Sequence, residues 1–127
     1  MKYTTIKEHH LYNKTFQRGN RYSGKYVSVF VLRDLAAKRL MRENPEKKYY
    51  NRLGVSVTKR VGGAVQRNRV KRILRAAYHA VSPSLKKGFL VVLSPREGIL
   101  AVKSTEVEAE LRRGFARLGM LASEDAK

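Results

Sequence analysis

The clearest chemistry in the sequence is the binding of phosphate by a run of cations. Seven of them stand between residues 59 and 75: Lys59, Arg60, Arg67, Arg69, Lys71, Arg72 and Arg75. No acidic residue lies between Arg60 and His79. Ordinary solvated surfaces mix charge signs, because like charges repel and opposite charges pair. The arginine fork suits paired contacts to phosphate oxygens. We therefore predict a nucleic-acid-binding surface; a solvated face and a membrane-surface helix are the alternatives.

The spacing of these cations places them on one face of a predicted helix over residues 63–81. At about 100° per residue, Arg67, Arg69, Lys71, Arg72 and Arg75 share one arc. The remaining arc is apolar and consists of Val70, Ile73, Leu74, Ala77, Tyr78 and Val81. Asn68 lies among the cations, and Lys59 and Arg60 extend the patch in the turn before the helix. One face is thus expected to pack on a sheet while the other binds phosphates.

Aromatic residues give a second indication of nucleic-acid binding. If the valines of a strand over residues 26–32 face the core, Phe30 stands on the opposite face, and Ser56 does the same in a strand over residues 53–58. Tyr12 and Phe16, four residues apart on a first helix, border the same surface. An aromatic surface among small polar groups and cations is a platform for unstacked bases. The alternative is that Tyr12, Phe16 and Phe30 form a second small core.

The residues offer little that could catalyse a reaction. The ten acids are scattered, and no closely spaced pair sits at a predicted strand end, where a metal-dependent nuclease would hold its ions. His9 and His10 are adjacent and would point about 100° apart on a helix, so they do not chelate one ion together. Cysteine is absent, which removes thiolate catalysis and cysteine-based zinc sites. We therefore assign no catalytic residue and predict a binding protein.

The elements that position these residues predict one mixed α/β or α+β domain. Residues 5–8 resemble a capping box that opens the first helix, and Gly19 closes it. A buried strand is expected over residues 89–93. A last helix is expected to be capped by Ser104 or Thr105 and to stop at Gly119. The RNA-binding domain is expected to span residues 1–121, with a helix or loop inserted at 34–51 and a polar tail at 122–127.

Composition sets the class of protein. The chain has 127 residues with 28 Lys and Arg against 10 Asp and Glu, a net charge of +18. Such a surplus is best tolerated beside a polyanion. The apolar runs are far shorter than the roughly 20 residues that span a bilayer, and the first residues lack the apolar segment of a signal peptide. We expect a soluble, cytoplasmic protein that has no membrane partner.

Two segments resemble the protein subunit of bacterial ribonuclease P. One is Arg52-Leu53-Gly54-Val55-Ser56-Val57, followed by Lys59-Arg60-Val61-Gly62-Gly63-Ala64-Val65-Gln66-Arg67-Asn68-Arg69-Val70-Lys71-Arg72 and Arg75. The other is the spacing of Ile6, Tyr12, Phe16 and Gly19. The likeness covers residues 6–33 and 52–81 well and 88–119 loosely. Gly63 departs from it, standing where that family usually has asparagine.

The resemblance implies a fold and a division of labour. It implies a two-layer sandwich with a mixed four-stranded sheet, about three helices and a left-handed βαβ crossover. The RNA subunit would carry the hydrolysis with Mg²⁺ bound mainly by that RNA, and the protein would assist. The partners would be ribonuclease P RNA and precursor tRNA, with no obligate protein partner. The implied contacts to the RNA subunit are Lys59, Arg60, Arg67, Asn68, Arg69, Lys71, Arg72 and Arg75. The implied 5′-leader cleft is lined by Tyr12, Phe16, Phe30 and Ser56.

Two other hypotheses fit the charge. A structural RNA-binding protein, such as a ribosomal protein, has the same cations but does not need the aromatic strand face. An autonomous nuclease is the other hypothesis, and the scattered distribution of the acids argues against it. The leading hypothesis is an accessory subunit that helps to remove the 5′ leader of precursor tRNA.

Overall fold

The computed structural model describes residues 4–6, 9–34, 42, 51–96 and 98–121. The strands are β1 (Thr4–Thr5), β2 (Asn20–Ser23), β3 (Val27–Arg33), β4 (Arg52–Val55) and β5 (Phe89–Pro95). The α-helices are α1 (His9–Arg18), α3 (Ala64–Val81) and α4 (Ser104–Arg117). Three short 3-10 helices, η1 (Lys59–Val61), η2 (Ser82–Ser84) and η3 (Ile99–Ala101), lie in the connections.

The strands form one mixed sheet in the order β1-β4-β5-β3-β2. β1, β4 and β5 are parallel neighbours, whereas β3 runs antiparallel to both β5 and β2. The predicted mixed four-stranded sheet is confirmed in β2 to β5, and the two-residue β1 adds a short edge. The predicted crossover from β4 through α3 to its parallel neighbour β5 is also present. The left-handed sense of this crossover stays an expectation from the resemblance.

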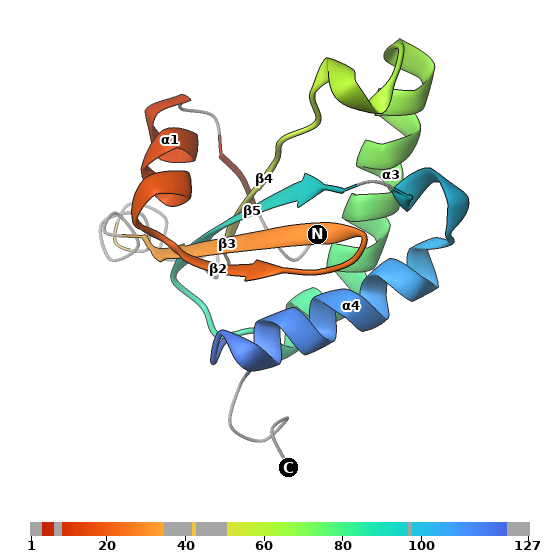
Figure 1. Cartoon of the computed structure of the whole chain (residues 1–127). Helices are drawn as coiled ribbons and strands as arrows, with labels where there is room; N and C mark the ends of the chain where they lie inside the picture. The colour runs from red at the N-terminus through yellow and green to blue at the C-terminus, as the bar shows by residue number, and fades with distance from the viewer. Residues whose placement is uncertain (1–3, 7–8, 35–41, 43–50, 97, 122–127) are drawn as a thin grey trace.

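The helices divide between the two faces of the sheet (Figure 1). α3 packs against α4, and α4 against β2 and β3, whereas α1 contacts β3 and β5 on the opposite face. Strand residues alternate between the faces, so the valines of β3 point toward α4 and Phe30 points toward α1. The sheet and the α3–α4 pair form the two layers of the sandwich, and α1 covers part of the second face.

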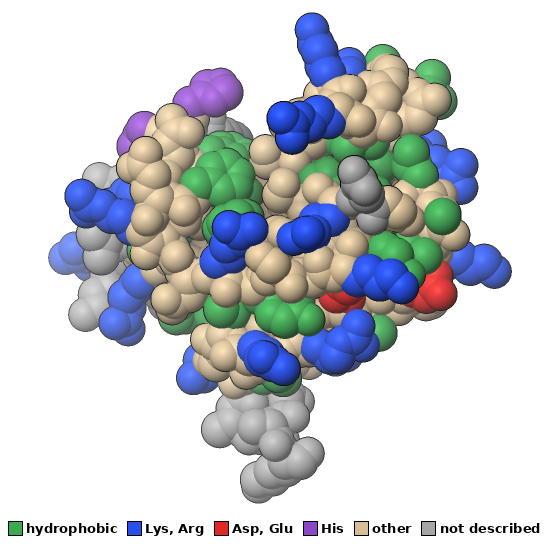
Figure 2. All heavy atoms as spheres, in the orientation of Figure 1, with side chains coloured by type: hydrophobic (Ala, Val, Ile, Leu, Met, Phe, Trp, Pro, Cys, Tyr) green, Lys and Arg blue, Asp and Glu red, His purple; other side chains and the backbone are tan. Residues whose placement is uncertain are grey.

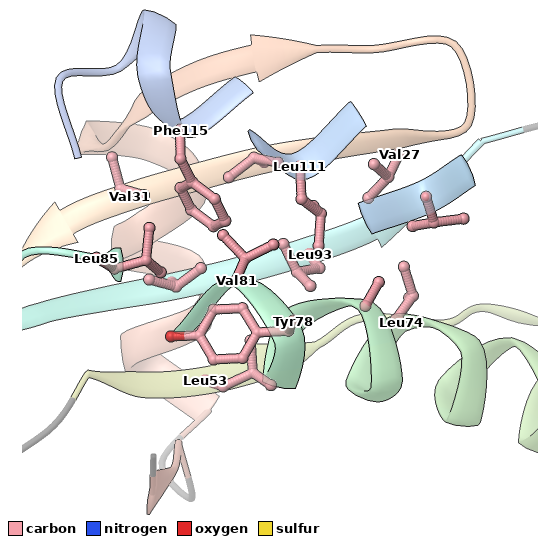
Figure 3. Packing of buried hydrophobic residues seen from close by; sticks show 14 of the residues in the cluster. Val27, Val31, Leu53, Leu74, Tyr78, Val81, Leu85, Leu93, Leu111 and Phe115 are labelled. Carbon is pink, nitrogen blue, oxygen red and sulfur yellow. The ribbon is translucent and has the colours of Figure 1, made fainter. Parts of the chain in front are cut away.

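The main core fills the space between the sheet and the α3–α4 pair. Figure 3 shows side chains of α3 and α4, such as Tyr78, Val81 and Phe115, meeting those of the strands, such as Leu53 and Leu93. Every α3 residue predicted to face the core is buried or partly buried in this cluster. A smaller buried cluster of Ile6, Leu90 and Val92 lies under α1. The sheet thus packs on both faces, against the α3–α4 pair on one and against α1 on the other.

The ends of three strands are tied together at one side of the sheet. The Arg52 guanidinium donates to both carboxylate oxygens of Asp34 at 2.7 and 2.9 Å. The amide of Asn51 donates to the Lys86 carbonyl at 2.7 Å and accepts from the Phe89 backbone N–H at 2.9 Å. Paired buried polar groups of this kind stabilise a structure. They fix the starts of β4 and β5 and the end of β3.

Several expectations about element boundaries were wrong. Thr5 belongs to β1 and pairs with Leu53, so it does not cap the first helix, which begins at His9 and ends at Arg18 as predicted. β2 was not predicted, and β4 ends at Val55 rather than at Thr58. The last helix begins at Ser104, but its cap is Lys103, whose backbone N–H donates to Glu106.

The predicted insertion at 34–51 and the polar tail at 122–127 lie almost entirely outside the described residues. No helix in the described part of the chain is long and apolar enough to cross a membrane.

Candidate RNA interface

The outer face of α3 carries the predicted cations. The inner face of the helix is buried and includes Val70, Leu74 and Tyr78. On the outer face Asn68, Arg69, Arg72 and Arg75 are exposed, and Arg67 and Lys71 are half-buried. The helix period therefore separates core from cations as the sequence predicted. The structure brings these residues together on one surface, which we call the α3 cationic face.

Arg67 differs from its neighbours because its guanidinium is tied to the turn that precedes the helix. One terminal nitrogen donates to the Gly62 carbonyl at 3.0 Å. Gly62 has a φ of 142°, a backbone conformation that favours glycine. The Gly62-Gly63 pair thus shapes the turn, and the Gly62 carbonyl orients the Arg67 guanidinium.

The cations of the α3 cationic face have no acidic partner among the residues that the structure describes. There, ion pairs join Arg52, Arg112 and Arg113 to acids, and none involves a cation of α3. A shallow hollow of about 410 Å³ on this face is lined by Val65, Asn68, Lys71, Arg72 and Arg75. A surface of unpaired cations on a rigid helix favours a polyanion.

The aromatic residues meet on the opposite face of the sheet. The rings of Phe16 on α1 and Phe30 on β3 lie 4.8 Å apart, edge to face at 85°. Phe16 is 36% exposed, one of the few large apolar side chains in the described chain that is not covered. Figure 2 shows hydrophobic side chains exposed beside α1, with Lys and Arg side chains around them. Phe16 and Phe30 thus form a partly exposed patch at the edge of α1, which we call the aromatic surface.

Tyr12 lies against the backbone of β4 rather than out in solvent. A Cβ atom on Gly54 would stand 2.6 Å from the ring carbons of Tyr12, so only glycine leaves room for this ring. Tyr12 and Phe30 also pack on the small cluster under α1. The second-core interpretation therefore describes part of these residues, while Phe16 stands outside that cluster.

A basic groove opens beside the aromatic surface. It has a volume of about 1170 Å³ and is lined by Lys25, Ser56, Thr58, Lys59, Arg60, Val61, Ser94, Pro95, Arg96, Gly98, Ile99 and Leu100. Ser56, predicted to line the cleft, thus lies with Lys59 and Arg60, which we predicted to extend the helix patch. The rest of the lining comes from the end of β5, the β2–β3 turn, and the segments around η1 and η3. The basic groove joins segments that are far apart in the sequence.

The strand register connects the aromatic surface to the basic groove. Phe30 pairs with Val92, which pairs with Gly54 in β4. Two residues along each strand, Ser28 pairs with Ser94, and the Ser56 backbone N–H donates to the neighbouring Leu93 carbonyl at 2.9 Å. Because side chains two residues apart share a face, a row of serines lies beside Phe30 and Val92 on the face of the sheet that carries α1. This serine row consists of Ser28, Ser94 and Ser56.

A buried carboxylate holds the β2–β3 turn at the edge of the groove. Glu110 of α4 is buried and accepts the backbone N–H groups of Lys25, Tyr26 and Val27 at 2.7 to 2.8 Å. Gly24 has no room for a Cβ atom beside this carboxylate. Glu110 thereby fixes the position of Lys25, whose ammonium also lies 5.4 Å from the Tyr26 ring centroid.

Sequence reasoning missed the groove residues contributed by turns. Lys25 and Arg96 were not named, because neither lies in a patterned helix or strand. A usable signal was present for Ser94, which alternates with the buried Val91 and Leu93 of a strand we did predict. The groove itself depends on the sheet order, which a single sequence does not show.

Comparison with known proteins decides the family. The ribonuclease P family model matches residues 1–119. The chain belongs to the ribonuclease P protein family. It is 37% identical over 92 residues to the ribonuclease P protein component of Natranaerobius thermophilus. The matched residues cover 72% of this chain and 70% of that protein. The protein is thus a subunit of the ribonucleoprotein endoribonuclease that processes tRNA, and it associates with ribonuclease P RNA. This membership favours the leading hypothesis over a ribosomal protein.

Solved structures agree with the ribonuclease P fold. The ribonuclease P protein of Staphylococcus aureus matches with a TM-score of 0.70 and 19% identity, over 93% of this chain and 97% of that one. The protein of Thermotoga maritima matches with a TM-score of 0.68 and 22% identity, over 86% and 92%. At this identity the likeness concerns the fold alone.

The described side chains do not form a metal site. No group of three or more histidine or acidic residues gathers within the part of the chain that the structure describes. Among the described acids, Asp34 pairs with Arg52 and Glu110 with backbone N–H groups. These two carboxylates are buried and already paired, so they do not fit a role as ligands for Mg²⁺, which usually keeps several of its waters.

Proposed function

We propose that this ribonuclease P protein binds two RNA elements on two separate surfaces. The α3 cationic face binds ribonuclease P RNA. The aromatic surface and the basic groove bind the single-stranded 5′ leader of precursor tRNA. The observation that carries the proposal is the partly exposed Phe16 ring, held edge-on to Phe30 on the sheet face opposite the main core.

Stacking and charge have different tasks in the leader path. Bases of a single strand stack on aromatic rings, and every base has a face that can do so. Phe16 offers that face, and Tyr12 and Phe30 fix the floor beneath it. Lys59, Arg60 and the other groove cations neutralise the phosphates of the same strand. The leader is therefore bound with little dependence on its sequence.

The α3 cationic face suits a structured RNA. Its arginines stand on one rigid helix and lack acidic neighbours in the described structure, so they meet phosphates whose positions are fixed by a folded RNA. Asn68 and Val65 add polar and apolar contacts among them. Val65 is 77% exposed, which supports an apolar contact at the centre of this surface.

The chemistry in this proposal belongs to the RNA subunit. Mg²⁺ is bound mainly by that RNA, and the protein favours its binding by reducing repulsion between enzyme and substrate phosphates. The protein itself has no catalytic residue in this scheme. We place it in the cytoplasm, where the lack of cysteine and the affinity for RNA both fit.

The test compares precursor tRNA with mature tRNA. Affinities are measured at one salt concentration for the RNA subunit alone and for the holoenzyme. We expect the protein to tighten precursor binding by about tenfold or more, since one or two stacked bases contribute about 1–3 kcal/mol each. Mature tRNA, which lacks a leader, should bind equally with and without the protein. An equal gain for both tRNAs would overturn the leader assignment.

A further inference from the structure

Arg21 lies at the open edge of the aromatic surface, on a strand that the proposal above does not use. β2 is an edge strand of the sheet, and Arg21 pairs directly with Phe30. The guanidinium carbon of Arg21 stands 5.5 Å from the Phe30 ring centroid. Phe30 therefore contacts both the Phe16 ring and the Arg21 guanidinium.

The guanidinium is oriented by a second contact. Arg21 Nε donates to the Ser23 hydroxyl at 2.9 Å, and Ser23 pairs with Ser28 in the serine row. Residues two apart on a strand share a face, so the Ser23 hydroxyl is placed to orient the Arg21 guanidinium. Arg21 thus lies at the edge of the sheet, beside both Phe30 and the serine row.

The two terminal nitrogens of Arg21 remain available for a ligand. Arg21 is exposed, and none of the described carboxylates forms an ion pair with it. An oriented guanidinium with free terminal N–H groups matches the geometry of a phosphate, which accepts paired hydrogen bonds. Only Phe30 separates the Phe16 ring from the Arg21 guanidinium. This spacing suits the base and the backbone phosphate of one nucleotide.

We infer that Arg21 binds a backbone phosphate of the leader, at the nucleotide whose base stacks on Phe16. The inference rests on the proposed function and extends it, because it makes β2 the outer wall of the leader path. Ser23 is a positioning residue in this arrangement. The contact reads the backbone and not the base, so it is independent of leader sequence.

The test measures holoenzyme affinity for precursor and mature tRNA with Arg21→Ala, Arg21→Lys and the control Arg117→Ala. Arg117 is an exposed arginine on α4, across the sheet from the leader path. We expect Arg21→Ala to weaken precursor binding about tenfold, as the loss of a charge-assisted contact does. The salt slope should fall by about 0.7, the value for one phosphate of a single strand. Arg21→Lys should lose part of the affinity, and mature tRNA should be unaffected.

Neutral methylphosphonate groups placed one at a time in the leader locate the contact. In the wild type one position should lose about tenfold in affinity, and in Arg21→Ala the same position should lose nothing further. If Arg21→Ala behaves like Arg117→Ala, the inference is wrong while the leader path stands. If the wild type binds precursor and mature tRNA equally, the proposed function fails and the inference fails with it. Melting temperatures of the variants separate either result from misfolding.

Discussion

Replacing Phe16 by alanine is expected to weaken leader binding more than it weakens the fold. A fully buried phenylalanine stabilises a protein by about 3–5 kcal/mol relative to alanine. Phe16 is 36% exposed and stands outside the buried clusters, and its main contact is the edge-to-face pair with Phe30 at 4.8 Å. Such a pair contributes about 0.5–1.5 kcal/mol. We therefore expect the free energy of unfolding to fall by about 1–2 kcal/mol.

The effect on the leader follows from the loss of one stacking surface. A stacked base contributes about 2 kcal/mol, so the dissociation constant for precursor tRNA should rise about thirtyfold. Affinity for mature tRNA and for ribonuclease P RNA should stay as in the wild type. The assay is equilibrium binding to the reconstituted holoenzyme at fixed salt, with thermal melting of the free protein alongside.

Phe89→Ala is the matched control. Phe89 is a half-buried phenylalanine at the start of β5, where it lines a different hollow with Leu118 and Met120. It should destabilise the fold by a similar amount without changing the ratio of precursor to mature tRNA affinity. Equal changes in that ratio for both variants would refute the stacking argument and make Phe16 a packing residue only.

Three further predictions address the other parts of the structure. The double variant Arg69→Ala, Arg72→Ala should weaken binding of ribonuclease P RNA and reduce its salt slope by about 1.4–1.8, that is 0.7–0.9 per lost phosphate contact, as read from a salt titration; an unchanged slope would argue against the α3 cationic face. Gly54→Ala should push the Tyr12 ring off β4, because the new Cβ would lie 2.6 Å from it; precursor affinity should fall while binding of ribonuclease P RNA persists, and an unaltered precursor affinity would show that Tyr12 does not shape the path. Glu110→Ala should leave three backbone N–H groups without their acceptor and reduce stability by about 3 kcal/mol or more, seen as a melting temperature at least about 10 °C lower; a smaller shift would mean that water replaces the carboxylate.

The basic helix was predictable because one local period controls both of its faces. Val70, Leu74 and Tyr78 recur at helical spacing and are buried, so the cations between them had to face outward. The same reasoning placed Phe30 opposite the valines of β3. The faces on which these residues lie depend only on helix and strand geometry. The sequence was therefore enough to predict them.

The start of the chain was wrongly predicted because a tertiary contact overrides a local motif. Residues 5–8 have the spacing of a capping box, but Thr5 pairs with Leu53 of β4 and the Ile6 N–H donates to the Leu53 carbonyl at 2.9 Å. A motif of adjacent residues carries no information about pairing with a strand that is distant in the sequence. β2 was missed for a related reason, since its exposed residues show little alternation and it is held by β3.

The two parts of the candidate site differ in the same way. The α3 cationic face lies on one element and was predicted as a unit. The basic groove takes Lys25 from a turn, Lys59 from η1 and Arg96 from the end of β5, and it exists only because the sheet order brings them together. Arg21 is a further example, since its contact with Phe30 depends on strand register.

Photo-crosslinking from one residue on each surface tests the separation of the two RNA elements most directly. A photoreactive side chain is placed at Ser56 in the leader path or at Arg72 on the α3 cationic face, and the holoenzyme is irradiated with precursor tRNA bound. We predict that Ser56 crosslinks to nucleotides of the 5′ leader and Arg72 to ribonuclease P RNA. Crosslinks from both positions to the same RNA element, or the reverse assignment, would contradict the account.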